Sequence, residues 1–439
     1  MSLLDTAAEA VRLGQAAGAD QVKAVTSRST HVDLQQREGR LERCTEAATL
    51  SLSVSLLVDE RYSTHSTSDL RPDALSAFIQ RAVDATRYLE PDPDRAMLPV
   101  DEMGTLDPSS LDTADDAAFA ARTPEASRDR VSELERAIQD QGPEDLVSAT
   151  AYAWEVRSEG CTVYSNGFQG RNARTWFGWG GHATIREPDG KLPEAYNFVS
   201  ASHLSDLPER DIIVADLLSR VDQTRKAGPA ASGRYPMLLD NRAAGRLLGA
   251  VLRPLSGVAL HERRSVFLDK LDQAVAAPHF TLWDDPTVPR GLGSRPYDAD
   301  GLKAQRRPIF EDGVLRTWFL DVYHARKLER APTTGQSSNL VVTPGMRSWQ
   351  QIAADLPRAI RVTSFLGGNS NPASGDFSFG IRGQLLEHGE PVANLSEMNI
   401  SGNLVDLLAD FVEAADDPWV FSSSRLPTLL FDGVQFSGT

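Results

Sequence analysis

The stretch Leu50-Ser51-Leu52-Ser53-Val54-Ser55-Leu56 alternates apolar and small polar side chains at every position. Successive side chains of a β-strand point to opposite faces, so this alternation predicts a strand with one buried face. Asp59-Glu60 follows shortly after it and predicts a tight turn, from which the chain would return as a hairpin. The fold is therefore expected to contain an antiparallel sheet that buries one face.

Helices flank this strand on both sides in the sequence. The first is indicated by apolar residues at helical spacing, namely Leu4, Ala7, Ala8 and Val11. Gly18 is suited to ending that helix, and residues 21–28 and 31–37 then predict two strands. After Pro72, which suits a first helical turn, a second apolar stripe consists of Leu75, Phe78, Ile79, Ala82 and Val83. Residues 1–90 are thus predicted to form an N-terminal α/β domain, with helices on an antiparallel sheet.

The composition changes twice further along the chain. Residues 91–116 are rich in Pro, Asp and Ser and have no apolar periodicity, which is typical of a linker. Residues 117–227 combine a charged helical stretch with strand-like stretches and predict a middle α+β region. Residues 233–439 begin with a strand and a helix and continue with alternating pieces such as Phe377-Ser378-Phe379-Gly380-Ile381, which predicts a mainly β, barrel-like C-terminal domain. The expected fold class is α+β.

The charge of the chain limits its partners. Among 439 residues there are 45 Lys and Arg against 61 Asp and Glu, a net charge of −16. This excess of acid argues against a surface that follows nucleic-acid phosphates and slightly favours basic or neutral peptides. The first residues do not resemble a secretory signal, no apolar run is long enough to span a membrane, and only two cysteines occur. We therefore expect a cytoplasmic protein with no nucleic-acid or membrane partner.

The sharpest candidate for catalysis is His261-Glu262. A zinc peptidase helix needs two imidazoles one turn apart and a carboxylate that polarises the bound water. Ser265 and Val266 stand where the second histidine would be, and the other nearby imidazole, His279, lies beyond Pro278. The sequence therefore predicts no metal ligands here and favours an exposed surface pair. An autonomous hydrolase remains an alternative if folding brings His261, Glu262 and His279 together.

Three further motifs are weak. Cys161 follows Glu159-Gly160 at a predicted hairpin and is expected to be a small, partly buried side chain, as is Cys44. The glycine-rich stretch 178–183 matches a loose dinucleotide pattern but lies inside a predicted strand, so it is interpreted as a chance match. Asp298-Ala299-Asp300-Gly301 resembles part of a calcium loop without its closing glutamate and is better interpreted as a turn.

A polar, glycine-rich stretch from Phe365 to Asp376 is the remaining candidate. Glycine lets one backbone approach another closely, which suits the capture of an extended peptide along a strand edge. The candidate peptide-binding residues are Gly367, Gly368, Asn369, Ser374, Gly375 and Asp376. A long surface turn between two strands is an equally good interpretation.

Motifs in a shared order extend over nearly the whole chain. They are Ala17-Gly18-Ala19-Asp20, Ser66-Thr67-Ser68-Asp69-Leu70, Asn166-Gly167-Phe168-Gln169-Gly170, Gly233-Arg234-Tyr235-Pro236, Leu255-Ser256-Gly257, Asp284-Asp285-Pro286, Gly291-Leu292-Gly293-Ser294-Arg295-Pro296, Thr334-Gly335, Ser374-Gly375-Asp376-Phe377-Ser378, Gly383, Gly389-Glu390 and Ile400-Ser401-Gly402-Asn403-Leu404. In this order the sequence resembles the TldD/PmbA family, and within it the PmbA branch, also called TldE.

The resemblance implies an N-terminal α/β domain, a C-terminal β-barrel-like domain, and assembly with a TldD-type chain into a peptidase that cuts unfolded or modified peptides. In that family the TldD-type subunit holds zinc on a His-Glu-x-x-x-His helix and a cysteine near the C-terminus. The comparable stretches here are interpreted as His261-Glu262-Arg263-Arg264-Ser265-Val266 and Ser422-Ser423-Ser424-Arg425-Leu426-Pro427, which lack the second histidine and the cysteine. The resemblance therefore implies no metal or other cofactor in this chain, and zinc only in the partner.

Three hypotheses follow. The first is a non-catalytic TldE-type subunit that forms the cavity wall and peptide-binding edges beside a TldD-type zinc peptidase, in a heterodimer that processes peptides. The second is a stand-alone peptide-binding module, possible as a homodimer. The third is the autonomous hydrolase at His261, Glu262 and His279. The family's historical name, modulator of DNA gyrase, implies no DNA contact by this acidic chain.

Overall fold

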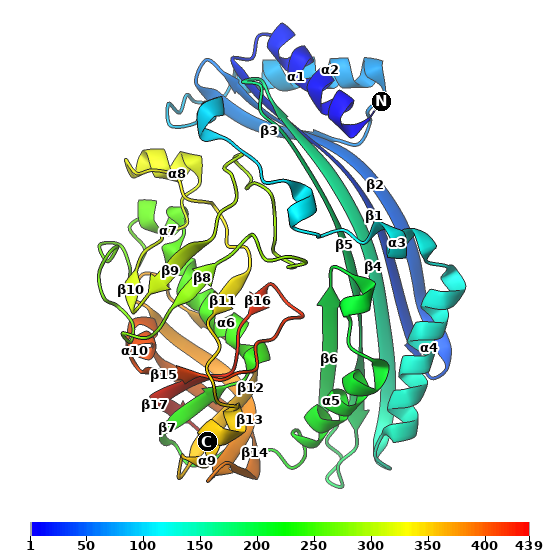
Figure 1. Cartoon of the computed structure of the whole chain (residues 1–439), viewed down its shortest axis with the longest axis vertical. Coiled ribbons are helices and arrows are strands. Elements are labelled where there is room, and N and C mark those ends of the chain that lie inside the picture. The colour runs from blue at the N-terminus through cyan, green and yellow to red at the C-terminus, as the bar shows by residue number, and fades with distance from the viewer. Residues whose placement is uncertain (1, 439) are drawn as a thin grey trace.

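A computed structural model describes residues 2–438 as two parts that face each other (Figure 1). One part is a long, curved, six-stranded sheet with helices on its outer face. The other is a C-terminal domain built around a β-barrel. The predicted α+β class, with helices on an antiparallel N-terminal sheet and a barrel-like C-terminal domain, is confirmed.

The first sheet is antiparallel, with the strand order β3-β2-β1-β4-β5-β6. Its strands are β1 (Gln21–Arg37), β2 (Arg40–Val58), β3 (Arg61–Thr67), β4 (Leu146–Tyr164), β5 (Gln169–Ile185) and β6 (Glu194–Ala201). The predicted turn at Asp59-Glu60 joins β2 to β3, and both residues have positive φ angles, of 48° and 63°. Residues 1–90 and 117–227 contribute strands to this one sheet, because β1 pairs with β4.

Two of the expected strand breaks are wrong. Residues 21–28 and 31–37 belong to a single strand, β1, and Glu159-Gly160 is no hairpin but part of β4. Gly160 pairs with Ser27 on one side and with Asn172 on the other. The continuous ladder on both sides satisfies the backbone of β4, and this tertiary pairing outweighs the local turn preference of glycine.

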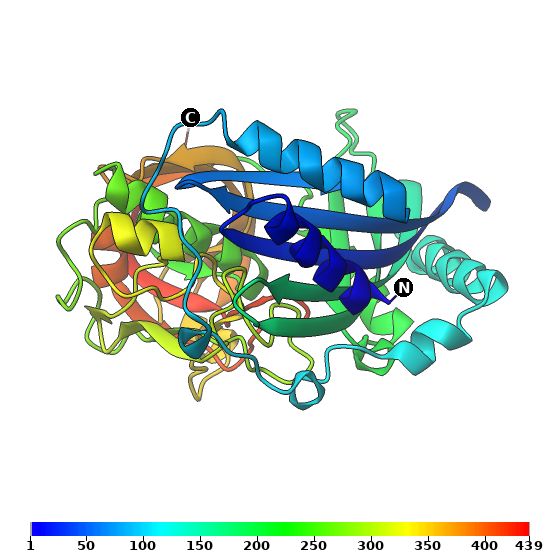
Figure 2. The ribbon, with the colours of Figure 1, turned by 90° about the horizontal axis from the view of Figure 1, so that it is seen from above.

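One face of the sheet is covered by helices, which Figure 2 shows from above for the first two. The helices of this part are α1 (Leu3–Ala16), α2 (Pro72–Thr86), α3 (Asp116–Ala121), α4 (Pro124–Gln141) and α5 (Arg210–Asp222). Val22 of β1 lies in the core with α1 and α2, whereas Leu34 of the same strand lies in the core with α4 and α5. Since Val22 and Leu34 have the same parity along one strand, α1, α2, α4 and α5 cover the same face, and the opposite face turns toward the C-terminal domain.

The C-terminal domain contains a closed barrel. Its strands are β7 (Gly233–Leu239), β12 (Ala359–Ser370), β13 (Asp376–Glu387), β14 (Glu390–Asn403) and β17 (Leu429–Ser437), with β15 (Phe411–Ala414) added beside β17. Pairing of β14 with β17 closes the ring. A second sheet consists of β8 (Leu282–Asp284), β9 (Arg307–Glu311), β10 (Val314–Leu315), β11 (Leu340–Val342) and β16 (Ser424–Arg425). Both sheets share one apolar core.

Short helices connect these strands. They are α6 (Asn241–Leu252), α7 (Gly257–His261), α8 (Val322–Lys327), α9 (Trp349–Ala354) and α10 (Leu404–Ala409). The 3-10 helices are η1 (Val100–Glu102), η2 (Pro108–Ser110), η3 (Leu204–Asp206) and η4 (Arg253–Leu255), which continues directly from α6. Among residues 2–438, no helix is both long and apolar enough to cross a membrane.

Candidate functional site

A cleft of about 340 Å³ lies between the edge of the first sheet and the C-terminal domain. One wall is β6, which Figure 1 shows on the side of the sheet nearest to the C-terminal domain. The other wall is formed by residues of α6, β12 and β13. The two halves of the chain thus build this cleft together.

The β6 wall is aromatic. Tyr196 and Phe198 point away from the helices, are 60% and 38% exposed, and stack on each other with ring centroids 5.7 Å apart. Because β6 is the last strand of its sheet, its outer edge has no strand partner among the described residues. A free edge with apolar side chains beside it suits an extended peptide, whose backbone can bond to the strand.

The glycines of β5 make room for these rings. A Cβ atom at Gly178 would come within 2.1 Å of Cε2 of Trp154, and one at Gly180 would meet the ring of Phe198 at 2.5 Å. The glycine-rich stretch 178–183 lies inside β5, without a helix after it. Its glycines therefore let aromatic rings lie flat on the inner face of the sheet.

The opposite wall offers a second strand edge. β7 pairs with β12 only from Ile360 to Val362. Beyond that point, residues 364–370 of β12 pair with β13, and their other edge has no strand partner in the part of the chain that the structure describes. Ser364 and Phe365 line the cleft at the start of this free edge. The cleft therefore lies between two unpaired strand edges.

Three of the predicted peptide-binding residues lie on the β12 edge. Gly367, Gly368 and Asn369 pair with Gly380, Phe379 and Ser378 of β13, respectively, and leave their other side free. Leu366, next to them, is 53% exposed. These three residues continue the free edge of β12 beyond the cleft, where the edge is available to a longer peptide.

The other three form a closed turn. The Oγ of Ser374 donates to Oδ2 of Asp376 at 2.7 Å, and Nδ2 of Asn403 donates to the Ser374 carbonyl and to Oδ1 of Asp376. Gly375 has a φ angle of +83°, which this turn requires. These hydrogen bonds hold the pKa of the Asp376 carboxyl below its usual range. Because their polar groups bond to one another, these residues fit a structural turn.

Arginines line the floor of the cleft. Nη1 of Arg242 donates to Oδ1 of Asn197 at 2.8 Å and to Oδ2 of Asp216 at 2.7 Å, and Arg220 also bonds to Asp216. The guanidinium of Arg242 lies 3.8 Å from the ring centroid of Trp419. Burial, and then the nearby Arg220, lower the pKa of Arg242 to about 10. Sequence reasoning missed these residues because they come from β6, α5, α6 and the segment before β16.

The residues of the autonomous-hydrolase alternative lie on different elements. His261 ends α7, is exposed, and lies beside His324 of α8, with ring centroids 6.4 Å apart. Glu262 pairs with Arg264. Nε2 of His279 lies 2.6 Å from the carbonyl oxygen of Val412, in β15. The structure thus places His261 and His279 in separate surroundings.

The donor set for zinc does not fit this chain. Ser424, in the stretch compared with the family's cysteine, lies against α6, since a Cβ atom at Gly245 would come within 3.1 Å of it. α6 reads Asn-Arg-Ala-Ala-Gly-Arg-Leu-Leu-Gly-Ala-Val-Leu and contains no His, Cys, Asp or Glu. Within residues 2–438, no three His, Cys, Asp or Glu side chains gather as a metal ion requires. The helix beside the C-terminal stretch is therefore α6, whereas His261 lies in α7.

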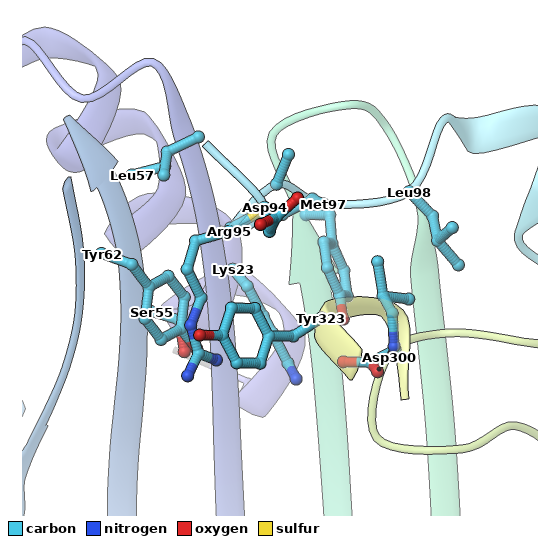
Figure 3. Close-up of a pocket in the computed structure, with 13 residues that line it drawn as sticks. Lys23, Ser55, Leu57, Tyr62, Asp94, Arg95, Met97, Leu98, Asp300 and Tyr323 are labelled. Atoms are coloured by element: carbon cyan, nitrogen blue, oxygen red, sulfur yellow. Dashed lines mark hydrogen bonds between the residues drawn. The ribbon is translucent and has the colours of Figure 1, made fainter. Parts of the chain in front are cut away.

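A second, smaller cavity of about 70 Å³ lies on the inner face of the first sheet (Figure 3). The guanidinium of Arg95 lies 3.5 Å from the ring centroid of Tyr323 and 5.0 Å from that of Tyr62. The backbone N–H of Val322 donates to Oδ2 of Asp300 at 3.0 Å. Burial raises the pKa of the Asp300 carboxyl. These contacts join the sheet, the segment after α2 and the C-terminal domain, which fits a structural junction.

The weaker motifs have structural roles. Oδ1 of Asp298 accepts from the backbone N–H groups of Asp300 and Leu302, which confirms a turn. Cys161 is buried, and burial raises the pKa of its thiol. The expectation of partial burial for Cys44 is wrong, because it is exposed on β2, where no helix covers the strand.

The chain is similar in sequence and in structure to proteins that are already known. Residues 232–438 match the family described as PmbA/TldA metallopeptidase C-terminal domain. A crystal structure described as a candidate modulator of DNA gyrase from Bacteroides thetaiotaomicron is 33% identical, with a TM-score of 0.94 over 99% of this chain and 98% of that one. Metalloprotease PmbA of Escherichia coli O157:H7 is 24% identical over 95% of this chain and 92% of its own. TldE from Thermococcus kodakarensis, at 19% identity and a TM-score of 0.88 over 99% of this chain and all of that one (100%), shares the fold.

Proposed function

The chain belongs to the PmbA/TldD family, and from this premise we propose that it is the non-catalytic, TldE-type subunit of a two-chain zinc metallopeptidase. In this role it binds extended peptides in its cleft, and a TldD-type partner supplies the zinc and cuts the bond. The chain itself would hold no zinc. The cytoplasmic location expected from the sequence stays a prediction.

The observation that carries the proposal is the cleft between two free strand edges. β6 ends the first sheet, and residues 364–370 of β12 are unpaired on one side. Backbone hydrogen bonds from a strand edge hold a peptide without reading its side chains, which suits unfolded substrates. Because α6, which lies beside this cleft, carries no metal-binding side chain, peptide binding is what the cleft supports.

A different strand edge, on β2, is the proposed contact with the partner chain. Residues 40–50 of β2 are exposed at every position and extend beyond β3, which pairs only with Leu52 to Val58. Exposed edge strands are templates for pairing with another chain unless something covers them. We therefore place the contact with a TldD-type chain, or with a second copy in the homodimer alternative, at this edge.

The test uses the purified full chain, alone and mixed with a zinc-bearing homologue. Zinc is measured by mass spectrometry and hydrolysis with an unfolded peptide. We expect no stoichiometric zinc and no turnover from the chain alone, and turnover from the mixture that exceeds that of the homologue alone. Zinc and turnover in the chain alone would overturn the proposal. Peptide binding by a homodimer without any gain in the mixture would favour the stand-alone binding module.

A further inference from the structure

We propose that Arg246 and Arg382 form a carboxylate-binding site in the cleft, so that the bound peptide is selected by a carboxylate it carries. This inference rests on the proposed function, because the peptide in question is the one that lies between β6 and β12. It adds a chemical preference that the backbone edges cannot supply.

Arg246 is the exposed member of an arginine pair on α6. It stands one helical turn after Arg242, so both side chains leave the same face of the helix and both line the cleft. Arg242 is occupied by Asn197 and Asp216. Arg246, in contrast, has no ion pair or hydrogen bond from its side chain to any described residue, and its guanidinium lies over the ring of Phe379, 5.7 Å from the centroid.

Arg382 reaches the cleft from β13. Its Nη1 donates to the carbonyl oxygen of Glu194 at 3.1 Å, which fixes the guanidinium beside β6. No carboxylate among residues 2–438 lies within ion-pair distance of Arg382. A guanidinium has five N–H donors, so several remain for a ligand. The single bond to a backbone carbonyl orients the side chain and leaves its charge uncompensated.

The carboxylates near the cleft have partners other than Arg246 and Arg382. Asp216 accepts from Arg220 and Arg242, and Asp240 accepts from Arg361 at 2.6 Å. Oε2 of Glu194 lies 3.3 Å from Nε2 of His182. The guanidinium groups of Arg246 and Arg382 thus line the cleft without an ion-pair partner among the described residues, in a chain whose net charge is −16. Two uncompensated arginines at one place in an acidic protein indicate an anionic ligand.

A carboxylate is the anion that a peptide brings. The planar fork of arginine matches a carboxylate with two parallel N–H···O bonds, which are short and strong. Ser364 and Phe365, at the start of the free β12 edge, line the same cleft as the two arginines. A peptide strand that binds to this edge can therefore place one of its own carboxylates against them. This group is either the C-terminal carboxylate or the side chain of an acidic residue.

The experiment measures binding of a fluorescently labelled, unstructured peptide to the full chain. The peptide has one Glu and a free C-terminus, and it is compared with an amidated version and with a version that has Gln in place of Glu. We expect Arg246→Gln and Arg382→Gln each to weaken the Kd by about tenfold, which corresponds to about 1.4 kcal/mol. The matched control is Arg330→Gln, an exposed arginine without an ion pair among the described residues, which should bind as the unchanged chain does.

The outcomes separate the sources of the carboxylate. Weaker binding of the amidated peptide assigns the site to the C-terminus, and weaker binding of the Gln peptide assigns it to an acidic side chain. In either case the arginine variants should no longer distinguish the weaker peptide from the original. If both variants bind the peptide as tightly as the unchanged chain and their thermal unfolding is unchanged, the carboxylate site is overturned, whereas the proposed function is not. If the unchanged chain binds none of the three peptides, the proposed function fails as well.

Discussion

Nη1 of Arg242 in α6 donates a hydrogen bond of 2.7 Å to Oδ2 of Asp216 in α5. The two helices belong to opposite halves of the chain, so this bond joins the C-terminal domain to the first sheet at the floor of the cleft. Arg242 also stacks on Trp419 and bonds to Asn197 of β6. One partly buried guanidinium thereby helps to set the distance between the two walls that would hold the peptide.

The first prediction concerns this bond. Arg242→Ala removes charge-assisted hydrogen bonds and should lower the free energy of unfolding by about 1.5–3 kcal/mol. Urea unfolding measures the loss. A double-mutant cycle with Asp216→Ala should show coupling, because the two side chains share the bond. Simple additivity of the two single losses would contradict the prediction, and Arg246→Ala, which breaks no bond among the described residues, is the control.

The second prediction concerns the buried carboxyl of Asp300. Burial, and more weakly the nearby Asp298, raise its folded-state pKa above the ordinary 3.8. Between the unfolded and the folded pKa the native state binds more protons, so the stability contributed by this group falls as pH rises through that window. Asp300→Asn should therefore gain stability relative to the unchanged chain as pH rises from below 3.8, and keep that gain at neutral pH. A stability difference that does not change with pH, measured by urea unfolding at several pH values, would refute it.

The third prediction concerns Gly178. A Cβ atom there would lie 2.1 Å from a ring atom of Trp154, so Gly178→Ala must displace the ring. We expect a loss of about 1–3 kcal/mol, as is usual for overpacking, together with a change in tryptophan fluorescence. Gly249→Ala is the matched control, because nothing lies within 4 Å of its added Cβ and alanine favours the helix. If Gly178→Ala costs no stability when it is added to Trp154→Ala, the overlap with the Trp154 ring is the cause of the loss.

The fourth prediction concerns the exposed edge of β2. Ala47→Lys combined with Ala48→Lys places a charge on each face of this edge, and lysine on an edge strand opposes pairing with another chain. We expect weaker complex formation with a TldD-type homologue in analytical ultracentrifugation, with unchanged thermal unfolding of the isolated chain. Gln80→Lys, on the exposed side of α2, should have no effect. Normal assembly of the double variant would move the contact elsewhere.

The sequence predicted the local features better than the cleft. The alternation at 50–56 marked a true strand, and Asp59-Glu60 marked a true turn, because both depend on neighbouring residues. Glu159-Gly160 failed because pairing on both sides of β4 overrides the local signal. Arg246 and Arg382 have no unusual neighbours in the sequence. They line one cleft only because α6 and β13 fold against β6. A single sequence does not reveal that these segments meet.

The last strand, β17, lies between β7 and β15 and also closes the barrel against β14. β7, the first strand of the C-terminal domain, pairs with β12 on one side and therefore gains its second neighbour only when residues 429–437 have been made. The first sheet, whose strands all precede residue 202, can form while synthesis continues. The barrel cannot close before residues 429–437 have been made, so a chain that stops before β17 would leave one edge of β7 unpaired and open to aggregation and proteolysis.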